Sequence, residues 1–230
     1  MKTHIDSLSV FIPDIFKRRI LDVGSDRGYF LIYMTLCGAR PIGLEMSDEH
    51  IERSYSNAKE KEIDIEVEKG NAENMPFKNE EFGFINVGEV VEHVEDPIAL
   101  FREVYRVLKK NGYVYMSVPN RFSMKDPHYH LYFVNWFPRS MCNTFIGILG
   151  KQKGSTKEAG RQRLNEMHYY TFSKIKKLLR QTGFNVTDIR EKKICLKVQN
   201  PILQYGAILL YKIIRPWYFQ TFHLLLRKYE

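Results

Sequence analysis

The chain has 230 residues, of which 44% are hydrophobic and 27% charged, as is usual for a folded domain with one substantial core. Its three cysteines are odd in number, lie far apart and form no CxxC pair, which argues against a zinc site and for a reducing compartment. Residues 1–19 hold no long apolar run and no small-residue cleavage site, so we expect no secretory signal.

The charge is divided unevenly between the two halves of the chain. Residues 1–118 carry 15 Lys and Arg against 21 Asp and Glu, a net charge of −6, whereas residues 119–230 carry 20 against 6, a net charge of +14. A lysine-rich solubilising face explains any single one of these lysines. A contrast of 20 charge units is more typical of a surface that attracts phosphates, nucleic acid or anionic lipid.

Short apolar runs alternate with amphipathic stretches through the first half. The clearest helix has Asp96 as its N-cap, Pro97 in its first turn and Gly112 just past its end. Strands that alternate with helices predict a parallel sheet with helices on both faces. The predicted strands are 19–24, 40–47, 63–77 with its loop, 82–94 with its exit and 112–120, and the predicted helices are 28–38, 48–62 and 96–112.

The second half departs from this rhythm. Residues 121–168 are aromatic and irregular, with a polar loop at 151–163, and we interpret them as an insertion in a domain that spans 1–200. A capped helix follows at 171–184, and residues 185–198 have the pattern of strand material. Residues 201–230 then form an apolar and basic tail that we predict to be helical.

The first turn, "DVGSDRG", has the composition of a ligand cradle. In a doubly wound sheet, ligands bind outside the carboxyl ends of the strands. Gly24 lets the backbone turn and approach a ligand, and Gly28 lets the next helix begin close to the strand. The next strand ends at Glu45, 23 residues after Asp22, where a carboxylate can accept two hydrogen bonds from a ribose diol.

Six stretches in order strengthen this interpretation: "LDVGSDRGYF", the end of "GLEMS", "GNAENMPF", "EVVEHVEDP", "REVYRVLKKNGYVYMSVPN" and "YYTFSKIKKLLRQTGF". Together they resemble the class I S-adenosylmethionine-dependent methyltransferases, in the branch that acts on small molecules and lipids. The resemblance covers residues 19–120 and, more weakly, 168–190. It implies an α/β fold with a Rossmann-like, doubly wound, mostly parallel seven-stranded sheet and helices on both faces.

The resemblance also implies the cofactor, S-adenosylmethionine, with S-adenosylhomocysteine as its product. The methionine end would lie against the first turn, the ribose and adenine against the second and third strand ends, and the sulfonium beside the fourth. The residues implied, in that order, are Asp22, Gly24, Ser25 and Gly28; Glu45 for the ribose and Met46 for adenine; Asn71 and Ala72 for the adenine edge; and Gly88 and Glu89.

Two positions depart from the family pattern. Asp26 stands where the family has its central glycine, so a second carboxylate either assists near the sulfonium or points to solvent. Asn71 stands where the family has an adenine-binding aspartate. Its amide oxygen can still accept a hydrogen bond from the adenine amino group, so we expect binding to survive in altered form.

Methyl transfer needs a general base only when the acceptor is a hydroxyl or a protonated amine. The catalytic candidates are His128 and His130 on the acceptor side, and His93, which the family more often uses to orient its loop. Alternate histidines on a strand could share a metal, but no carboxylate lies at useful spacing and we predict none. Residues 168–170, "HYY", either close the pocket or pack on the next helix, and the aromatic residues of 132–137 form core or pocket wall.

The tail allows two interpretations. Residues 202–214 are apolar on almost every side, but the run is too short for a spanning helix of about 20 residues. It is either a helix that completes the core or a dimer interface, or an interfacial element in a membrane surface, which the basic second half favours.

We therefore expect a methyltransferase that acts on a hydroxyl or amine of a small molecule, plausibly a sugar or a lipid-linked intermediate, with residues 121–168 as the acceptor cap. The alternatives are an RNA methyltransferase that uses the basic half, and a non-catalytic cofactor-binding partner protein. No appended RNA-binding module is recognisable, and the intact cofactor motifs argue against a non-catalytic role. The expected location is cytoplasmic, with peripheral attachment to the inner face of the membrane if the tail is interfacial.

Overall fold

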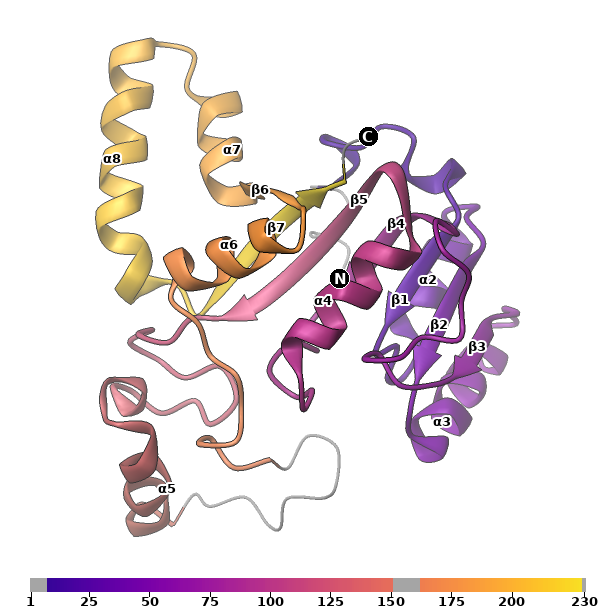
Figure 1. The fold of residues 1–230 in the computed structure, drawn as a ribbon, viewed down its shortest axis with the longest axis horizontal. Coiled ribbons are helices and arrows are strands. Elements are labelled where there is room, and N and C mark those ends of the chain that lie inside the picture. Colours follow the sequence, from indigo (N-terminus) through magenta and orange to yellow (C-terminus); the bar gives the residue numbers. More distant parts are fainter. Residues whose placement is uncertain (1–7, 151–161, 229–230) are drawn as a thin grey trace.

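The structure, a computed structural model, describes residues 8–150 and 162–228, and a single twisted sheet organises them (Figure 1). The strand order is β3-β2-β1-β4-β5-β7-β6, in which β7 alone runs antiparallel to its neighbours β5 and β6. The seven-stranded, mostly parallel sheet that the sequence predicts is thus confirmed. The strands are β1 Ile20–Val23, β2 Pro41–Glu45, β3 Glu66–Lys69, β4 Phe82–Val87, β5 Leu108–Pro119, β6 Asn185–Asp188 and β7 Thr221–Arg227.

The first-half helices form where local signals place them. Ser47 and Asp96 cap α3 and α4 with their side chains, and Gly28 begins α2 in the left-handed conformation. One difference is that α4 ends at Val107 and β5 begins at once, so residues 108–111 are strand rather than helix, and a positive φ at Asn111 interrupts them. The bounds are η1 Ile15–Lys17, α2 Tyr29–Leu36, α3 Asp48–Lys59 and α4 Pro97–Val107.

Two apolar cores cover the two faces of the sheet. The larger core contains buried residues of α4 and α6, such as Leu100 and Leu179, and the smaller contains residues of α2 and the N-terminal segment, such as Met34 and Leu8. Helix α6 spans Phe172–Gln181, confirming the capped helix expected there, with Thr171 as its N-cap. Among the described residues, no helix is long and apolar enough to cross a membrane.

The insertion between β5 and α6 has a small core of its own. It contains η2 (Val134–Trp136) and α5 (Arg139–Ile148), which pack around Cys142 and Ile146. In Figure 1, α5 lies apart from the helices that cover the sheet. The polar loop expected at 151–163 lies almost entirely outside the described residues.

Residues 185–198 are not all strand, contrary to our prediction. Strand β6 ends at Asp188, and α7 (Ile189–Lys197) begins there, because the Asp188 carboxylate accepts hydrogen bonds from the backbone N–H groups of Arg190 and Glu191. A side-chain cap of this kind outweighs the strand propensity of the residues that follow.

The prediction of a helical tail over 201–230 is wrong in its second part. Helix α8 spans Pro201–Tyr218, but Thr221–Arg227 is β7, inserted between β5 and β6. Leu224 and Leu226 are completely buried there. The domain therefore does not end at residue 200, because residues 221–227 belong to its sheet.

Candidate active site

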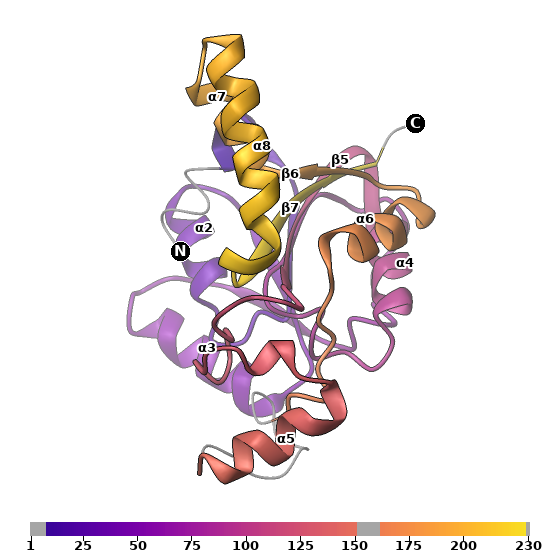
Figure 2. The same ribbon diagram turned by 90° about the vertical axis from the view of Figure 1, so that its left-hand side faces the viewer.

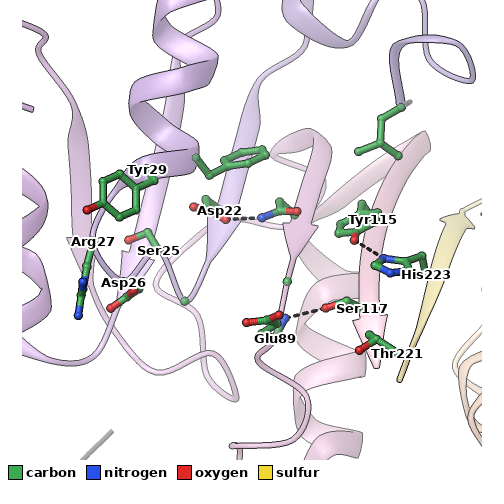
Figure 3. Close-up of a pocket in the computed structure, with 15 residues that line it drawn as sticks. Asp22, Ser25, Asp26, Arg27, Tyr29, Glu89, Tyr115, Ser117, Thr221 and His223 are labelled. Carbon is green, nitrogen blue, oxygen red and sulfur yellow. Dashed lines mark hydrogen bonds between the residues drawn. The ribbon is translucent and has the colours of Figure 1, made fainter. Parts of the chain in front are cut away.

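A cavity of about 460 Å³ opens at the carboxyl ends of the central strands (Figure 3). Half of the predicted cofactor residues line it, from the turn after β1 and from the end of β4. They are Asp22, Gly24, Ser25, Gly88 and Glu89. The opposite side of the cavity comes from β5 and β7, through Tyr115, Ser117, Thr221 and His223, and the N-terminal Leu8 also lines it.

Asp22 is a buried carboxylate, with 3% of its surface exposed. It is the register partner of Asn86 on β4, whose amide donates a hydrogen bond of 2.6 Å to Asp22 Oδ1. Burial raises the pKa of Asp22 to about 8, assisted by the negative charges of Glu45 and Asp26 and opposed by the Asn86 hydrogen bond. A cationic group in the cavity would favour the ionised form, so the site is electrostatically prepared for a cation.

The turn after β1 is formed by residues in the left-handed conformation. Gly24 has φ +69°, and a Cβ there would come within 2.7 Å of the Val90 side chain. Asp26 has φ 44°, although it is not a glycine. Its side chain is 57% exposed, lies 3.4 Å from His50 Nδ1, and the residue lines the cavity. Asp26 is thus exposed to solvent at the edge of the cavity, and its assistance near the sulfonium stays a prediction.

The predicted ribose and adenine residues lie outside this cavity. Glu45 ends β2 and ties two strand ends together, because its carboxylate accepts hydrogen bonds from Asp26 N (3.0 Å), Met46 N and Ser47 N (both 2.9 Å). Asn71 closes its own turn by accepting from the backbone N–H of Glu73. The roles of Glu45, Met46, Asn71 and Ala72 in binding stay predictions.

The residues of the cradle fit the expected cofactor. The Ser25 hydroxyl is buried and has no hydrogen-bond partner among the described residues, so a polar atom of a ligand can be its partner. Asp22 is suited to an amino group, and Gly24 lines the cavity beside it with its backbone. Asp22 and Ser25 would hold the methionine end and Glu45 the ribose, and the cofactor would supply an activated methyl group.

Sequence reasoning missed the polar wall on β5 and β7. Ser117 Oγ accepts a hydrogen bond of 2.8 Å from Glu89 N, and the Tyr115 hydroxyl lies 2.6 Å from His223 Nδ1. Burial raises the pKa of Tyr115, so its hydroxyl keeps its proton at neutral pH. Alternation along β5 would have placed Tyr115 and Ser117 on one face. Nothing in the sequence signals His223, because the apolar run around it has the pattern of a helix.

Two of the predicted bases, His93 and His128, lie together, but neither lines the cavity. His128 Nε2 lies 3.3 Å from Glu92 Oε1, and the nearest ligand atoms of Glu92, His93 and His128 all lie within 4.8 Å of one another. Such a group could hold a divalent cation after a small adjustment. Our argument that no carboxylate lies at useful spacing from His128 and His130 was wrong for His128, because Glu92 comes to it from the loop after β4.

His130 is separate from this cluster. We expected His128 and His130 to point the same way along a strand, but residues 126–130 form a turn. In this turn the Asp126 carboxylate accepts from the backbone N–H groups of His128 and Tyr129, and His130 has φ 56°. The Asp126 carboxylate also accepts from the Tyr169 hydroxyl at 2.8 Å.

Residues 168–170 brace the insertion and the sheet. The backbone N–H of His168 donates to Glu92 O, Tyr169 is buried in the core of the insertion, and Tyr170 is buried in the main core. For the two tyrosines, packing is thus the observed role. Of the aromatic residues at 132–137, several are exposed rather than core.

The comparisons with known proteins agree with this fold. A family model described as "Methyltransferase domain" matches residues 5–189. The ubiquinone biosynthesis O-methyltransferase of Aliivibrio fischeri is 32% identical over 108 residues, 46% of each chain, and the uncharacterized protein MJ1123 of Methanocaldococcus jannaschii is 30% identical over 128 residues, 56% of each. The chain thus spans about half the length of these curated relatives.

Solved structures show the same fold over nearly the whole chain. The YcgJ protein of Bacillus subtilis superposes with a TM-score of 0.60 at 17% identity, covering 99% of this chain and 100% of that one. An S-adenosylmethionine-dependent methyltransferase of Mesorhizobium loti superposes with a TM-score of 0.60 at 16% identity, covering 97% and 96%. With the matching family domain, the glycine turn and the buried Asp22 beside it, the chain belongs to the class I methyltransferase family.

Proposed function

We propose that this protein is an S-adenosylmethionine-dependent methyltransferase that methylates a hydroxyl group of a small-molecule acceptor, such as a sugar or a lipid-linked intermediate. The observation that supports this most is that one cavity joins the cofactor turn to a polar wall. Asp22 and Glu89 lie on the cofactor side of it, and Ser117 and His223 lie on the opposite side (Figure 3). An acceptor held at that wall would lie beside the expected sulfonium, where in-line attack is possible.

A hydroxyl acceptor must lose its proton as its oxygen bonds to the methyl carbon and the carbon–sulfur bond breaks. His223 lines the cavity, and the Tyr115 hydroxyl lies 2.6 Å from Nδ1 of its ring, which positions the ring at the cavity wall. We therefore place His223 as the residue that contacts the acceptor hydroxyl and moves its proton.

His128 is the second candidate for this role. Its partner Glu92 is almost completely buried, and a buried carboxylate can orient a histidine side chain. His128 does not line the cavity as the chain stands, so this role requires the insertion to bring it closer. An amine acceptor remains compatible with either residue. The relative from Aliivibrio fischeri is named as an O-methyltransferase, which supports the hydroxyl.

Methyl transfer to extracted small molecules and lipids tests the proposal directly. The full chain is incubated with S-adenosylmethionine labelled in its methyl group, and labelled products are separated into water-soluble and lipid fractions. His223→Ala should lower the turnover about 10²–10⁴-fold and leave cofactor affinity within about twofold. His168→Ala is the matched control, because it alters a histidine that bonds to Glu92 through its backbone.

The same assay separates the two candidates. If His128→Ala abolishes turnover and His223→Ala does not, the base lies in the insertion. A third result would instead assign the Glu92–His93–His128 group to a metal. In that case chelation abolishes turnover and added divalent cation restores it, whereas the Glu92→Gln variant does not show this dependence on the cation. If the methyl label appears in transfer RNA rather than in small molecules, the proposed class of acceptor is wrong.

A further inference from the structure

Helix α8 is apolar on its outer side, whereas polar side chains lie on the side that packs against the protein. The side of α8 that faces the protein carries Gln204, Tyr211 and Arg215, which are partly or fully buried. Their spacing, three to four residues or a multiple of it, places them on one side of the helix. The other side of a surface helix is normally polar. Here the exposed residues are apolar, and Ile202 and Leu203 are 81% and 66% exposed. The rest of this outer set is Tyr205, Leu209, Leu210, Ile213, Ile214, Trp217 and Tyr218.

This helix is held firmly against the body. The Tyr211 hydroxyl donates to Asp188 Oδ2 at 2.7 Å, and Arg215 Nη1 lies 3.2 Å from the same oxygen. Arg215 also lies 3.5 Å from the centre of the Phe172 ring of α6. The outer side of α8 is therefore exposed even though the helix is bonded to the rest of the protein.

The insertion continues the apolar surface. Trp136 and Trp217 are each 47% exposed, and their ring centres lie 5.5 Å apart, so the two segments meet there. Helices α5 and α8 both lie on the left-hand side in Figure 1 and face the viewer in Figure 2. We call this surface the apolar face. On the insertion its exposed members, linked to Trp217 through ring or backbone contacts, are Met124, Tyr132, Phe133 and Trp136.

Basic residues accompany the apolar face. Residues 189–218 carry six Lys and Arg but only one acidic residue, Glu191, and residues 121–150 carry three against one, Asp126. Lys192 and Lys197 are exposed, and Lys193 lies between them. Partial burial and the charges of Lys197 and Arg190 lower the pKa of Lys193, as expected where positive charges gather.

We propose that the apolar face lies in the surface of an anionic lipid bilayer, with the side chains of α8 and of the insertion among the headgroups and upper acyl chains. Tryptophan and tyrosine beside aliphatic residues, in segments rich in lysine and arginine, are the composition of interfacial elements. A second copy of the chain fits less well, because a symmetric contact would bring the same basic residues of both copies together. The proposal is independent of which acceptor the enzyme methylates.

The two tryptophans provide an intrinsic probe, because they are the only two in the chain and both belong to the apolar face. Full-length protein is mixed with vesicles of phosphatidylglycerol and phosphatidylcholine, or of phosphatidylcholine alone. With the anionic vesicles we expect tryptophan emission to shift to shorter wavelength and the protein to float with the lipid. High salt should weaken the binding without removing it, because apolar insertion is insensitive to salt.

Matched variants separate the apolar and charged contributions. The triple variant Ile202→Gln, Leu209→Gln, Ile213→Gln changes exposed side chains only and should lower vesicle partition at least about tenfold. Leu36→Gln, at a 68% exposed residue of α2, should have no effect. Lys192→Gln with Lys197→Gln should weaken binding at low salt, whereas Lys59→Gln with Lys61→Gln should not.

Three results would overturn the proposal. The first is unchanged tryptophan emission with anionic vesicles at low salt. The second is a concentration-dependent dimer in sedimentation that the triple variant abolishes. The third is binding of transfer RNA with a steep salt dependence, equal in the wild type and the triple variant, without vesicle binding. Cofactor affinity, measured in the same samples by calorimetry, should stay constant, so failure here leaves the proposed reaction untouched.

Discussion

At the scale of single residues, Asp22 connects the electrostatics of the site to pH. Its pKa is about 8 in the folded chain, against 3.8 for an unperturbed aspartate, so between these values the folded protein holds a proton that the unfolded chain has released. Stability should therefore fall as pH rises from about 4 to about 8. A cationic ligand shifts Asp22 in the folded protein from its protonated form to its ionised form, because the cation binds the ionised carboxylate.

The first prediction at this scale concerns how the affinity for the cofactor changes with pH. S-adenosylmethionine should bind more tightly as pH rises from about 6 to about 8, with release of a proton when it binds. Calorimetry in buffers of different ionisation enthalpy measures that proton. Asp22→Asn keeps an oxygen for the Asn86 hydrogen bond and should flatten both pH dependences while weakening binding. A wild-type affinity that does not change over this range would contradict the raised pKa.

Glu45 gives a second prediction at this scale. Glu45→Gln removes the charge and keeps one acceptor oxygen, so it should weaken cofactor binding about tenfold through loss of a charge-assisted contact to the ribose. Glu49→Gln, on exposed α3, is the control. Because Glu45 also holds three backbone N–H groups, thermal unfolding without cofactor must be measured too. Equal affinity in variant and wild type would place the ribose elsewhere.

Gly24 illustrates why a close-approach glycine makes a poor probe of binding. A valine there would adopt an unfavourable positive φ and collide with Val90, so lost binding would not distinguish a filled cradle from a distorted turn. The carboxylates of Asp22 and Glu45 can be neutralised at nearly constant volume, which is why the predictions use them.

At the scale of elements, local signals account for what the sequence predicted well. The turn glycines, the Asp96 and Thr171 caps and the acidic strand ends act over a few residues, and all of them recur in the structure. The contacts that were missed join distant segments: Ser117 with Glu89, Tyr115 with His223, and Glu92 with His128. Periodicity cannot supply such pairs, because they depend on strand order.

Strand β7 is the clearest example. Its burial alternates at first, but Leu224, Leu225 and Leu226 are all buried, since the strand is covered on both faces of the sheet. A continuous apolar run after an apolar helix has no period of two and reads as more helix. The strand also follows α7 and α8, which are inserted between the paired strands β6 and β7.

An element-scale prediction tests this placement. Leu224→Ala should lower the free energy of unfolding by about 2–5 kcal/mol, because it leaves a cavity in the sheet core. Leu209→Ala, on the exposed side of α8, should change it by less than about 0.5 kcal/mol. Urea unfolding measures both. Similar losses in the two variants would mean that α8 is covered by protein and that the apolar face is not free.

At the scale of the whole molecule, the uneven distribution of charge predicts how the protein is oriented at an anionic surface. The acidic half contains the strands that carry the cofactor turn, and the basic half contains the apolar face. A body with this charge distribution should approach an anionic surface with its basic half first, and the residues 1–118 should be repelled from it. The cofactor turn would then face away from the lipid or along its edge.

Hydrogen exchange on anionic vesicles tests that orientation. Backbone amides of α8 and of residues 121–150 should exchange more slowly when vesicles are present, because lipid covers them. Helix α3, exposed and in the acidic half, should exchange at its free rate. The triple α8 variant should lose the protection of both segments together, since Trp136 and Trp217 join them into one surface. Protection of α3, or of the insertion alone in that variant, would show that the molecule binds lipid through a different face.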